Sequence, residues 1–216
     1  MTKPQILIIS SILVLPFNLF VFGTASTNYG AGIVFLLGCI FYWLYILLVV
    51  LLLKKDDFHN FSKMLSSNHE FQYAGLLKTV AFLPAIGAFF VGFLPNFGHI
   101  TLKIGLIILG VSVINGTIEE IYWRGLYLKV FRQNRYFILI VSPLLFALMH
   151  GSFLAIKGIT YQGGALALVG GALFMGLLWS YVSFRSDRID YCIAGHVLVN
   201  VFAFTGLFVE NNLQFF

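Results

Sequence analysis

The chain alternates between long apolar runs and short polar segments. Seven apolar runs can be traced, and at about 1.5 Å per residue in a helix each one spans most of a ~30 Å hydrocarbon core. The runs cover, approximately, residues 5–23, 30–53, 74–94, 101–131, 136–153, 163–184 and 189–209. This pattern predicts an all-α fold, a polytopic transmembrane bundle of about seven helices, and is compatible with an eighth short helix or a re-entrant segment. We interpret residues 1–216 as a single membrane domain.

The composition supports a membrane protein over a soluble one. Of the 216 residues, 60% are hydrophobic and only 10% are charged, whereas soluble domains carry about 25% charged residues. In a soluble protein the net charge of +5 would suggest nucleic acid, but here we assign it to cytoplasmic loops and expect no nucleic-acid partner. Cys39 and Cys192 lie in different apolar runs, so we interpret them as packing residues rather than as a disulfide or a metal site.

Lysine and arginine residues predict the orientation, because the cytoplasmic loops of membrane proteins are enriched in them. With a cytoplasmic N-terminus and seven alternating helices, nine basic residues fall inside and two outside. The inside group is Lys3, Lys54, Lys55, Lys63, Lys129, Arg132, Arg135, Arg185 and Arg188, and the outside group is Lys103 and Lys157. The first run is also compatible with a signal peptide, but it is longer than the ~7–15 apolar residues of a signal, which favours a retained helix.

The fourth run contains two adjacent carboxylates, Glu119 and Glu120, followed by Arg124. Ionisable groups at membrane depth are costly, so each one needs a reason to be there. Glu120 and Arg124 are four residues apart on one helical face and are expected to pair. Ser112, Asn115 and Glu119 share a neighbouring strip of the same helix. Glu119 has no cation within its own helix, so we expect it to be available for chemistry as a general base.

Two other apolar runs carry polar residues at helical spacing. Phe146 and His150 are four residues apart in the fifth run, and His196 and Asn200 are four apart in the seventh. At about 1.5 Å per residue, Glu119, both histidines and Asn200 lie within roughly 12–22 Å of the predicted cytoplasmic loops. These four side chains can therefore converge at one level of the bundle.

A set of one glutamate, two histidines and one asparagine permits two ways of hydrolysing a peptide bond. The sequence has no HExxH motif of a zinc protease and no GxSxG motif. In the first mechanism Glu119 and His150 activate a water, while His196 and Asn200 donate hydrogen bonds to the developing oxyanion. In the second, Glu119, His150 and His196 hold a metal ion, for which zinc is a possibility. The residues alone do not separate the two mechanisms.

Three motifs on separate apolar helices resemble one known family. They are Glu119-Glu120-x-x-x-Arg124, Phe146-x-x-x-His150 and His196-x-x-x-Asn200. Together they resemble the CPBP intramembrane proteases, also called the Abi or CAAX protease family, which includes Rce1-type prenyl-protein endopeptidases and bacteriocin-processing or self-immunity proteins. The resemblance covers about residues 101–209, which we expect to form the catalytic helical core.

The resemblance implies a membrane endopeptidase whose active site lies in a cavity of the bundle. It implies Glu119 as the water-activating base with His150, and His196 with Asn200 as the oxyanion-stabilising pair. Glu120, Arg124 and Phe146 map to supporting positions. The Rce1-like arrangement favours a glutamate-dependent enzyme without a cofactor over a metal-dependent one.

The expected function is hydrolysis of a membrane-associated peptide or protein precursor, near the cytoplasmic side of the membrane. The short loops and the lack of extra domains resemble bacterial proteins, which favours a bacterial cell membrane. A bacteriocin or signalling precursor is then a more plausible substrate than a prenylated CAAX protein. Two rival functions stay open at this point. One is a non-catalytic immunity or partner-binding protein that uses the same cavity, and the other is a transporter in which the ionisable residues relay protons.

Overall fold

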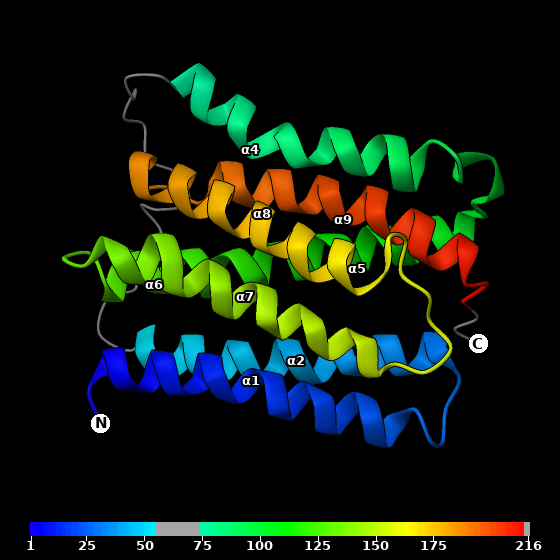
Figure 1. Cartoon of the computed structure of the whole chain (residues 1–216), viewed down its shortest axis with the longest axis horizontal. Coiled ribbons are helices and arrows are strands. Elements are labelled where there is room, and N and C mark those ends of the chain that lie inside the picture. Colours follow the sequence, from blue (N-terminus) through cyan, green and yellow to red (C-terminus); the bar gives the residue numbers. More distant parts are fainter. Residues whose placement is uncertain (55–73, 214–216) are drawn as a thin grey trace.

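The computed structural model describes residues 1–54 and 74–213, and within them every regular element is a helix (Figure 1). Seven helical spans are long and apolar enough to cross a membrane. The predicted all-α transmembrane bundle is thereby confirmed for the described residues. The predicted polar loop that contains Lys55 and Lys63 lies outside them.

The spans follow the predicted runs closely. The first two are α1 (Lys3–Ala25) and α2 (Ala31–Lys54), and the third joins α4 (Ala74–Ala88) to the π-helical turn η1 (Phe89–Phe93). The fourth consists of α5 (Leu102–Glu120), the π-helical turn η3 (Ile121–Leu126) and α6 (Tyr127–Val130). The fifth comprises η4 (Phe137–Val141), α7 (Ser142–His150) and the 3₁₀ turn η5 (Gly151–Ala155), and the last two are α8 (Gly164–Ser186) and α9 (Asp190–Glu210). A short 3₁₀ turn, η2 (Phe97–His99), precedes α5.

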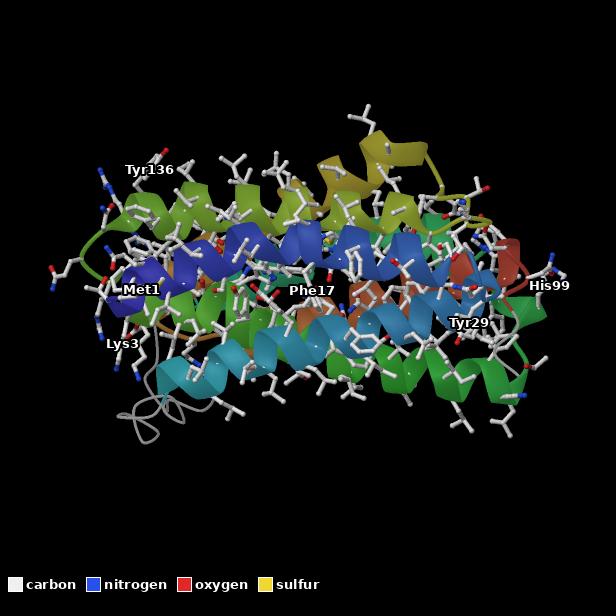
Figure 2. The ribbon with its side chains drawn as sticks, turned by 90° about the horizontal axis from the view of Figure 1, so that it is seen from below. Met1, Lys3, Phe17, Tyr29, His99 and Tyr136 are labelled. Atoms are coloured by element: carbon white, nitrogen blue, oxygen red, sulfur yellow. The ribbon has the colours of Figure 1, made fainter. Side chains whose placement is uncertain are left out.

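The helices lie side by side along one axis, with α1 and α2 on one side of the bundle and α4 on the other (Figure 1). Helix α9 packs against both α4 and α5, and α8 packs against α7. The chain's N-terminus and the turn near Tyr136 lie at one end, while Tyr29 and His99 lie at the opposite end (Figure 2). The described basic residues that were predicted to be cytoplasmic belong to the first of these ends, which we call the basic end.

The fourth span is continuous, as predicted, but it changes helix type directly after Glu120. Residues Ile121–Leu126 form a π-helical turn, and five of the six residues are buried. A π turn inserts one residue relative to an α-helix, so it rotates the following side chains, and such turns are common at functional sites. Apolar periodicity does not reveal this change, because the run remains apolar through the turn.

Two serines of α1 support the π turn. The Ser10 and Ser11 hydroxyls lie 2.9 and 3.0 Å from the Tyr122 hydroxyl, and the Tyr127 hydroxyl donates to Ser11 at 2.8 Å. All four side chains are buried. Buried hydroxyls are costly unless they are paired, so this cluster fixes α1 against the span that carries the two glutamates.

Close backbone contacts fix α9 next to that span. A Cβ on Gly195 would lie 2.4 Å from the backbone oxygen of Ala81 in α4, and a Cβ on Gly116 of α5 would lie 3.0 Å from the backbone nitrogen of Val197. A Cβ at Gly195 would force a shift of the backbone and one at Gly116 would be unusually tight, so the lack of a Cβ in glycine permits both approaches. The backbone on both sides of His196 is thus held tightly against α4 and α5.

Candidate active site

The two adjacent glutamates lie at the end of α5 and face different neighbours. Successive residues of an α-helix point about 100° apart, at 3.6 residues per turn, so the side chains diverge. Both are buried, with 1% of Glu119 and 0% of Glu120 exposed. The surroundings of the two carboxylates therefore decide what each of them can do.

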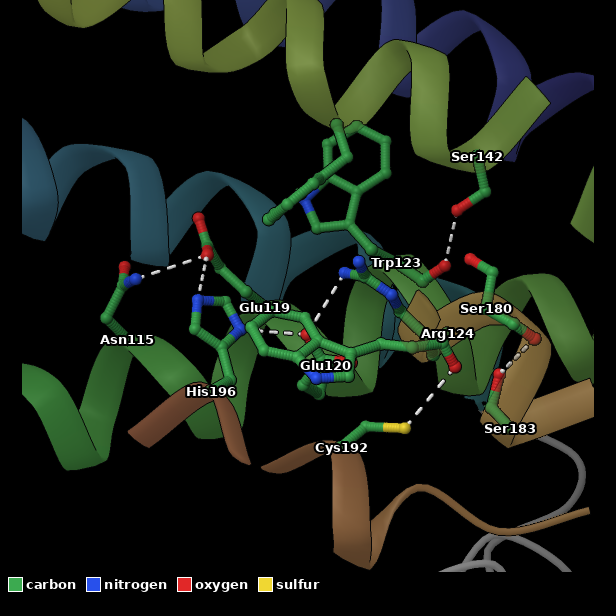
Figure 3. Close-up of polar contacts among 12 residues, drawn as sticks. Asn115, Glu119, Glu120, Trp123, Arg124, Ser142, Ser180, Ser183, Cys192 and His196 are labelled. Atoms are coloured by element: carbon green, nitrogen blue, oxygen red, sulfur yellow. Dashed lines mark hydrogen bonds and ion pairs between the residues drawn. The ribbon is translucent and has the colours of Figure 1, made fainter. Parts of the chain in front are cut away.

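Glu120 is enclosed by charged and aromatic groups. Its Oε1 lies 3.0 Å from Nη1 of Arg124 in an ion pair, and accepts a hydrogen bond from Nδ1 of His196 at 2.8 Å (Figure 3). The Arg124 guanidinium lies over the rings of Phe146 and Trp179, at 4.4 and 5.5 Å from their centroids. Aromatic faces attract cations, so they stabilise the buried arginine. The predicted Glu120–Arg124 pair is confirmed, and Phe146 lies where a supporting residue was expected.

Glu119 has different contacts. Its Oε2 accepts a hydrogen bond from Nδ2 of Asn115 at 3.1 Å and lies 3.3 Å from Nε2 of His196 (Figure 3). The shared helical strip predicted for Asn115 and Glu119 is confirmed by the first of these contacts. The imidazole of His196 thus bridges the two carboxylates, which its sequence position four residues before Asn200 did not suggest.

The two contacts of His196 restrict where its protons lie. Nδ1 carries a hydrogen, because the Glu120 carboxylate that it faces is an acceptor. Nε2 and Oε2 of Glu119 would repel each other at 3.3 Å without a proton between them. The contact between His196 and Glu119 is an ion pair when both ring nitrogens of His196 are protonated. This arrangement suits a carboxylate that must accept and release a proton.

The ring of His196 is held from a third side by Trp179. The two rings stack with centroids 4.5 Å apart and an angle of 26° between their planes. The Trp179 Nε1–H donates to the backbone oxygen of Ala81 at 2.9 Å, which ties α8 to α4. Sequence reasoning did not single out Trp179, because a tryptophan in an apolar run is indistinguishable from a packing or interface residue.

A cavity of about 250 Å³ borders Glu119, and His150 and Asn200 form part of its wall together with Asn115. The His150 Nδ1–H donates to the backbone oxygen of Phe146 at 2.9 Å, because a carbonyl only accepts. The Nε2 of a neutral His150 is then an acceptor. Nδ2 of Asn200 is buried and has no hydrogen-bond partner in the described part of the chain. The cavity wall therefore holds a carboxylate, an unprotonated imidazole nitrogen and an amide donor.

Three of the four predicted catalytic side chains thus meet at one cavity, and the fourth lies beside it. His196 does not belong to the cavity wall formed by the described residues, although it contacts Glu119. No contact between Glu119 and His150 shorter than the hydrogen-bond limit occurs among the described residues. Depth estimates along a helix do not give the direction of a side chain, so this division was not foreseen.

The cavity extends away from the basic end. Its wall includes Phe35 of α2, Gly92 of η1, Tyr161 and Gln162 of the segment before α8, and Leu207 of α9. All of these belong to the half of the bundle that ends at Tyr29 and His99 (Figures 1 and 2). Burial raises the pKa of the Tyr161 phenol, which donates to the backbone oxygen of Phe153 at 2.9 Å. The cavity thus extends toward the end that carries Tyr29 and His99, while cleavage near the cytoplasmic side stays a prediction.

The described residues do not form a complete metal site. They contain no group of three or more His, Cys, Asp and Glu side chains that could hold a metal ion. Glu119 and His196 contact each other, but Nδ1 of His196 and Glu120 are used in the arginine cluster. Zinc in an enzyme needs three protein ligands. The predicted ligand set of Glu119, His150 and His196 is not gathered into such a group among the described residues, and the use of a metal stays a prediction.

Comparison with known proteins gives one family. A family model described as "Type II CAAX prenyl endopeptidase Rce1-like" matches residues 101–202. The comparisons with curated proteins and with solved structures gave no match. The matched segment contains all three motifs, from the glutamate pair to Asn200, and it also contains Trp179, whose ring stacks on His196. Residues 101–202 are thus similar to the Rce1-like type II CAAX prenyl endopeptidase family, in agreement with the resemblance seen in the three motifs.

Proposed function

We propose that this protein is an intramembrane endopeptidase that hydrolyses a membrane-associated peptide or protein precursor by activating water with Glu119. One observation carries the proposal: a buried glutamate, with one carboxylate oxygen held by Asn115 and His196, borders a cavity that also contains His150 and Asn200. The family supports a protease activity in general. The glutamate-dependent mechanism is our inference from the geometry.

In the proposed reaction a water in the cavity loses a proton to Glu119. The His150 imidazole accepts a hydrogen bond from the same water and thereby orients the water. The resulting hydroxide attacks the carbonyl carbon of the substrate, and the carbonyl oxygen becomes an oxyanion. Asn200 Nδ2 donates a hydrogen bond to this oxyanion, because it has no other partner in the described part of the chain. The proton then passes to the amide nitrogen as the carbon–nitrogen bond breaks, which releases a new N-terminus and a new carboxylate.

His196 takes a different part in this reaction from the one first expected. It does not border the cavity, but its Nε2 lies 3.3 Å from the Glu119 oxygen and its Nδ1 is tied to Glu120. We propose that His196 holds the Glu119 carboxylate in place and shares the proton that Glu119 accepts. The oxyanion is then stabilised by Asn200 and by groups of the substrate itself.

The substrate enters as an apolar, membrane-associated segment in this proposal. Apolar side chains such as Phe35, Met175 and Phe204 make up most of the cavity wall, so charged side chains near the scissile bond are disfavoured. A bacteriocin or signalling precursor fits this description. With a cytoplasmic N-terminus, as the basic residues predict, the substrate reaches Glu119 from the opposite face of the membrane.

The test compares the protein with its Glu119→Gln variant in cell membranes. Terminal-peptide mass spectrometry is expected to find new N-termini with the wild type and to find them about 10²–10⁴-fold less abundant with Glu119→Gln, which is the usual contribution of a general base. Asp187→Asn is the matched carboxylate-to-amide control, because Asp187 lies in an exposed turn in the left-handed region, where asparagine is also favoured. It is expected to retain cleavage.

The rival function predicts the opposite result. A non-catalytic immunity or partner-binding protein needs the cavity but not the carboxylate base. If Glu119→Gln accumulates to the wild-type level, yields the same termini and protects cells as well as the wild type does, the protein is a binder and not a protease.

A further inference from the structure

A chain of two hydrogen bonds links α2 to the Glu119 carboxylate. The Trp43 Nε1–H donates to Oδ1 of Asn115 at 2.8 Å, and Nδ2 of Asn115 donates to Oε2 of Glu119 at 3.1 Å. Trp43 is partly buried, and it lies 72 residues before Asn115 in the sequence. It lies outside residues 101–202, the segment that matches the family.

The indole and the Glu119 carboxylate favour the same orientation of the asparagine amide. An asparagine side chain has one acceptor oxygen and one donor nitrogen, and a rotation of 180° exchanges them. The indole of Trp43 is a donor only, so the amide oxygen must face it. The amide nitrogen is then directed to Glu119. The opposite orientation would set two acceptors against each other at Glu119 and two donors against each other at Trp43, so the indole adds to the preference that the carboxylate already imposes.

Two tyrosines near Trp43 on α2 form hydrogen bonds of their own, and neither bond involves Asn115. The Tyr42 hydroxyl accepts a hydrogen bond from Nε1 of Trp123 at 3.0 Å, and the Tyr45 hydroxyl donates to the backbone oxygen of Ser10 at 2.9 Å. These two bonds hold α2 against η3 and against α1. Trp43 lies between them in the sequence, and its N–H is the donor that reaches Asn115 on α5.

We propose that Trp43 is a positioning residue for the reaction, which it supports by orienting the Asn115 amide toward Glu119. The inference rests on the proposed function, because it assigns a role relative to the Glu119 base. Trp43 is not part of the cavity wall formed by the described residues. It acts on the rate of the chemical step through Asn115, and has no direct contact with the substrate bound in that cavity.

The first experiment is a mutant cycle with Trp43→Phe, Asn115→Ala and the double variant. Phenylalanine keeps an aromatic ring but lacks the N–H. The probe is a synthetic peptide that spans a Glu119-dependent cleavage site, added to vesicles that contain the full-length protein. Trp43→Phe is expected to lower kcat about threefold to tenfold, the rate equivalent of one hydrogen bond, with KM within about twofold of the wild type.

The cycle separates positioning from a structural role. If Trp43 acts through Asn115, adding Trp43→Phe to Asn115→Ala changes kcat by less than about twofold, because the link is already absent. If Trp43 supports the bundle in another way, its effect multiplies with that of Asn115→Ala. A full multiplicative effect overturns the proposal, and so does a wild-type kcat in Trp43→Phe.

Tyr45→Phe is the matched control. It removes one hydrogen bond from the same helix, two residues away, and that bond points to α1 rather than to Asn115. It is expected to leave kcat unchanged. An equal loss of kcat in Tyr45→Phe would show that the packing of α2, and not the indole N–H, sets the rate.

A spectroscopic measurement keeps the inference independent of cleavage. The infrared difference spectrum between the wild type and Glu119→Gln isolates the bands of the Glu119 carboxyl group. Trp43→Phe is expected to shift these bands and Tyr45→Phe is not. If no Glu119-dependent cleavage is found, the proposed function fails, but a shift in Trp43→Phe still establishes the link. Unshifted bands in Trp43→Phe overturn it.

Discussion

Glu119 and Glu120 are adjacent in sequence and buried to the same degree, yet they belong to two different regions of the molecule. Glu120 faces Arg124 and the Nδ1 of His196, among the rings of Phe146 and Trp179. Glu119 faces Asn115, the Nε2 of His196 and a cavity. We call these regions the ion-pair side and the cavity side. His196 contacts both carboxylates, one with each of its ring nitrogens.

The comparison shows that two adjacent residues of one helix can have separate roles, one in stability and one in chemistry. A buried carboxylate next to a buried arginine is neutralised as a pair, and removing either partner leaves a charge that the bundle cannot solvate. A buried carboxylate next to a cavity has room for a water or a substrate carbonyl instead. Substitutions on the ion-pair side should therefore lower stability first, and those on the cavity side should lower activity alone.

The strongest test of the ion-pair side is Arg124→Met. The variant leaves the Glu120 carboxylate buried without its arginine, and both side chains of the pair are 0% exposed. We expect the free energy of unfolding to fall by about 3–5 kcal/mol, with loss of activity as a consequence. The measurement is the unfolding midpoint in mixed detergent micelles.

The double variant Glu120→Gln with Arg124→Met is the control for this prediction. It removes both charges, and replacing a buried pair by neutral groups of similar volume is often close to neutral in stability. Recovery of most of the lost stability is expected. If the double variant is no more stable than Arg124→Met, the loss comes from the packing of the guanidinium between Phe146 and Trp179 and not from the unpaired charge.

The cavity side is tested by Asn200→Ala. Its Nδ2 has no hydrogen-bond partner in the described part of the chain, so its removal breaks no bond of the amide nitrogen and should cost little stability. Loss of one oxyanion donor typically lowers the rate about 10²–10³-fold. We expect that loss of cleavage rate with an unchanged unfolding midpoint.

Thr205→Val serves as the control on the same helix. The Thr205 hydroxyl donates to the backbone oxygen of Val201 at 2.8 Å, within α9, and does not belong to the cavity wall formed by the described residues. It should cleave at the wild-type rate. A wild-type rate in Asn200→Ala would show that Asn200 does not stabilise the oxyanion in the proposed mechanism.

Much of the fold followed from the sequence. The seven spans were visible because apolar length is a strong signal in lipid, and the Glu120–Arg124 pair followed from helical spacing. The π turn after Glu120 was not predicted, because it changes hydrogen bonding without changing the apolar pattern.

The site was predicted in part, since its members but not their contacts follow from spacing. Helical spacing relates residues on one helix, and it placed Asn115 beside Glu119. It does not relate residues of different helices, so the bridge from His196 to both glutamates was missed. The hydrogen bond from Trp43 was missed for the same reason, because its indole and Asn115 lie on separate helices. The catalytic roles of Glu119, His150, His196 and Asn200 stay predictions.

The smallest expected effect comes from Gly195→Ala, which acts on both sides at once. The added Cβ would lie 2.4 Å from the backbone oxygen of Ala81, so α9 must move away from α4. His196 follows Gly195 directly and would move with it, which disturbs its contacts with both carboxylates. We expect a loss of about 1–3 kcal/mol in the free energy of unfolding, the usual cost of overpacking, together with slower cleavage. Gly171→Ala in α8 is the matched control, since nothing lies within 4 Å of its Cβ position. If Gly195→Ala slows cleavage without lowering stability, the backbone contact with α4 positions His196 but does not hold the bundle together, and the two sides can be uncoupled at this residue.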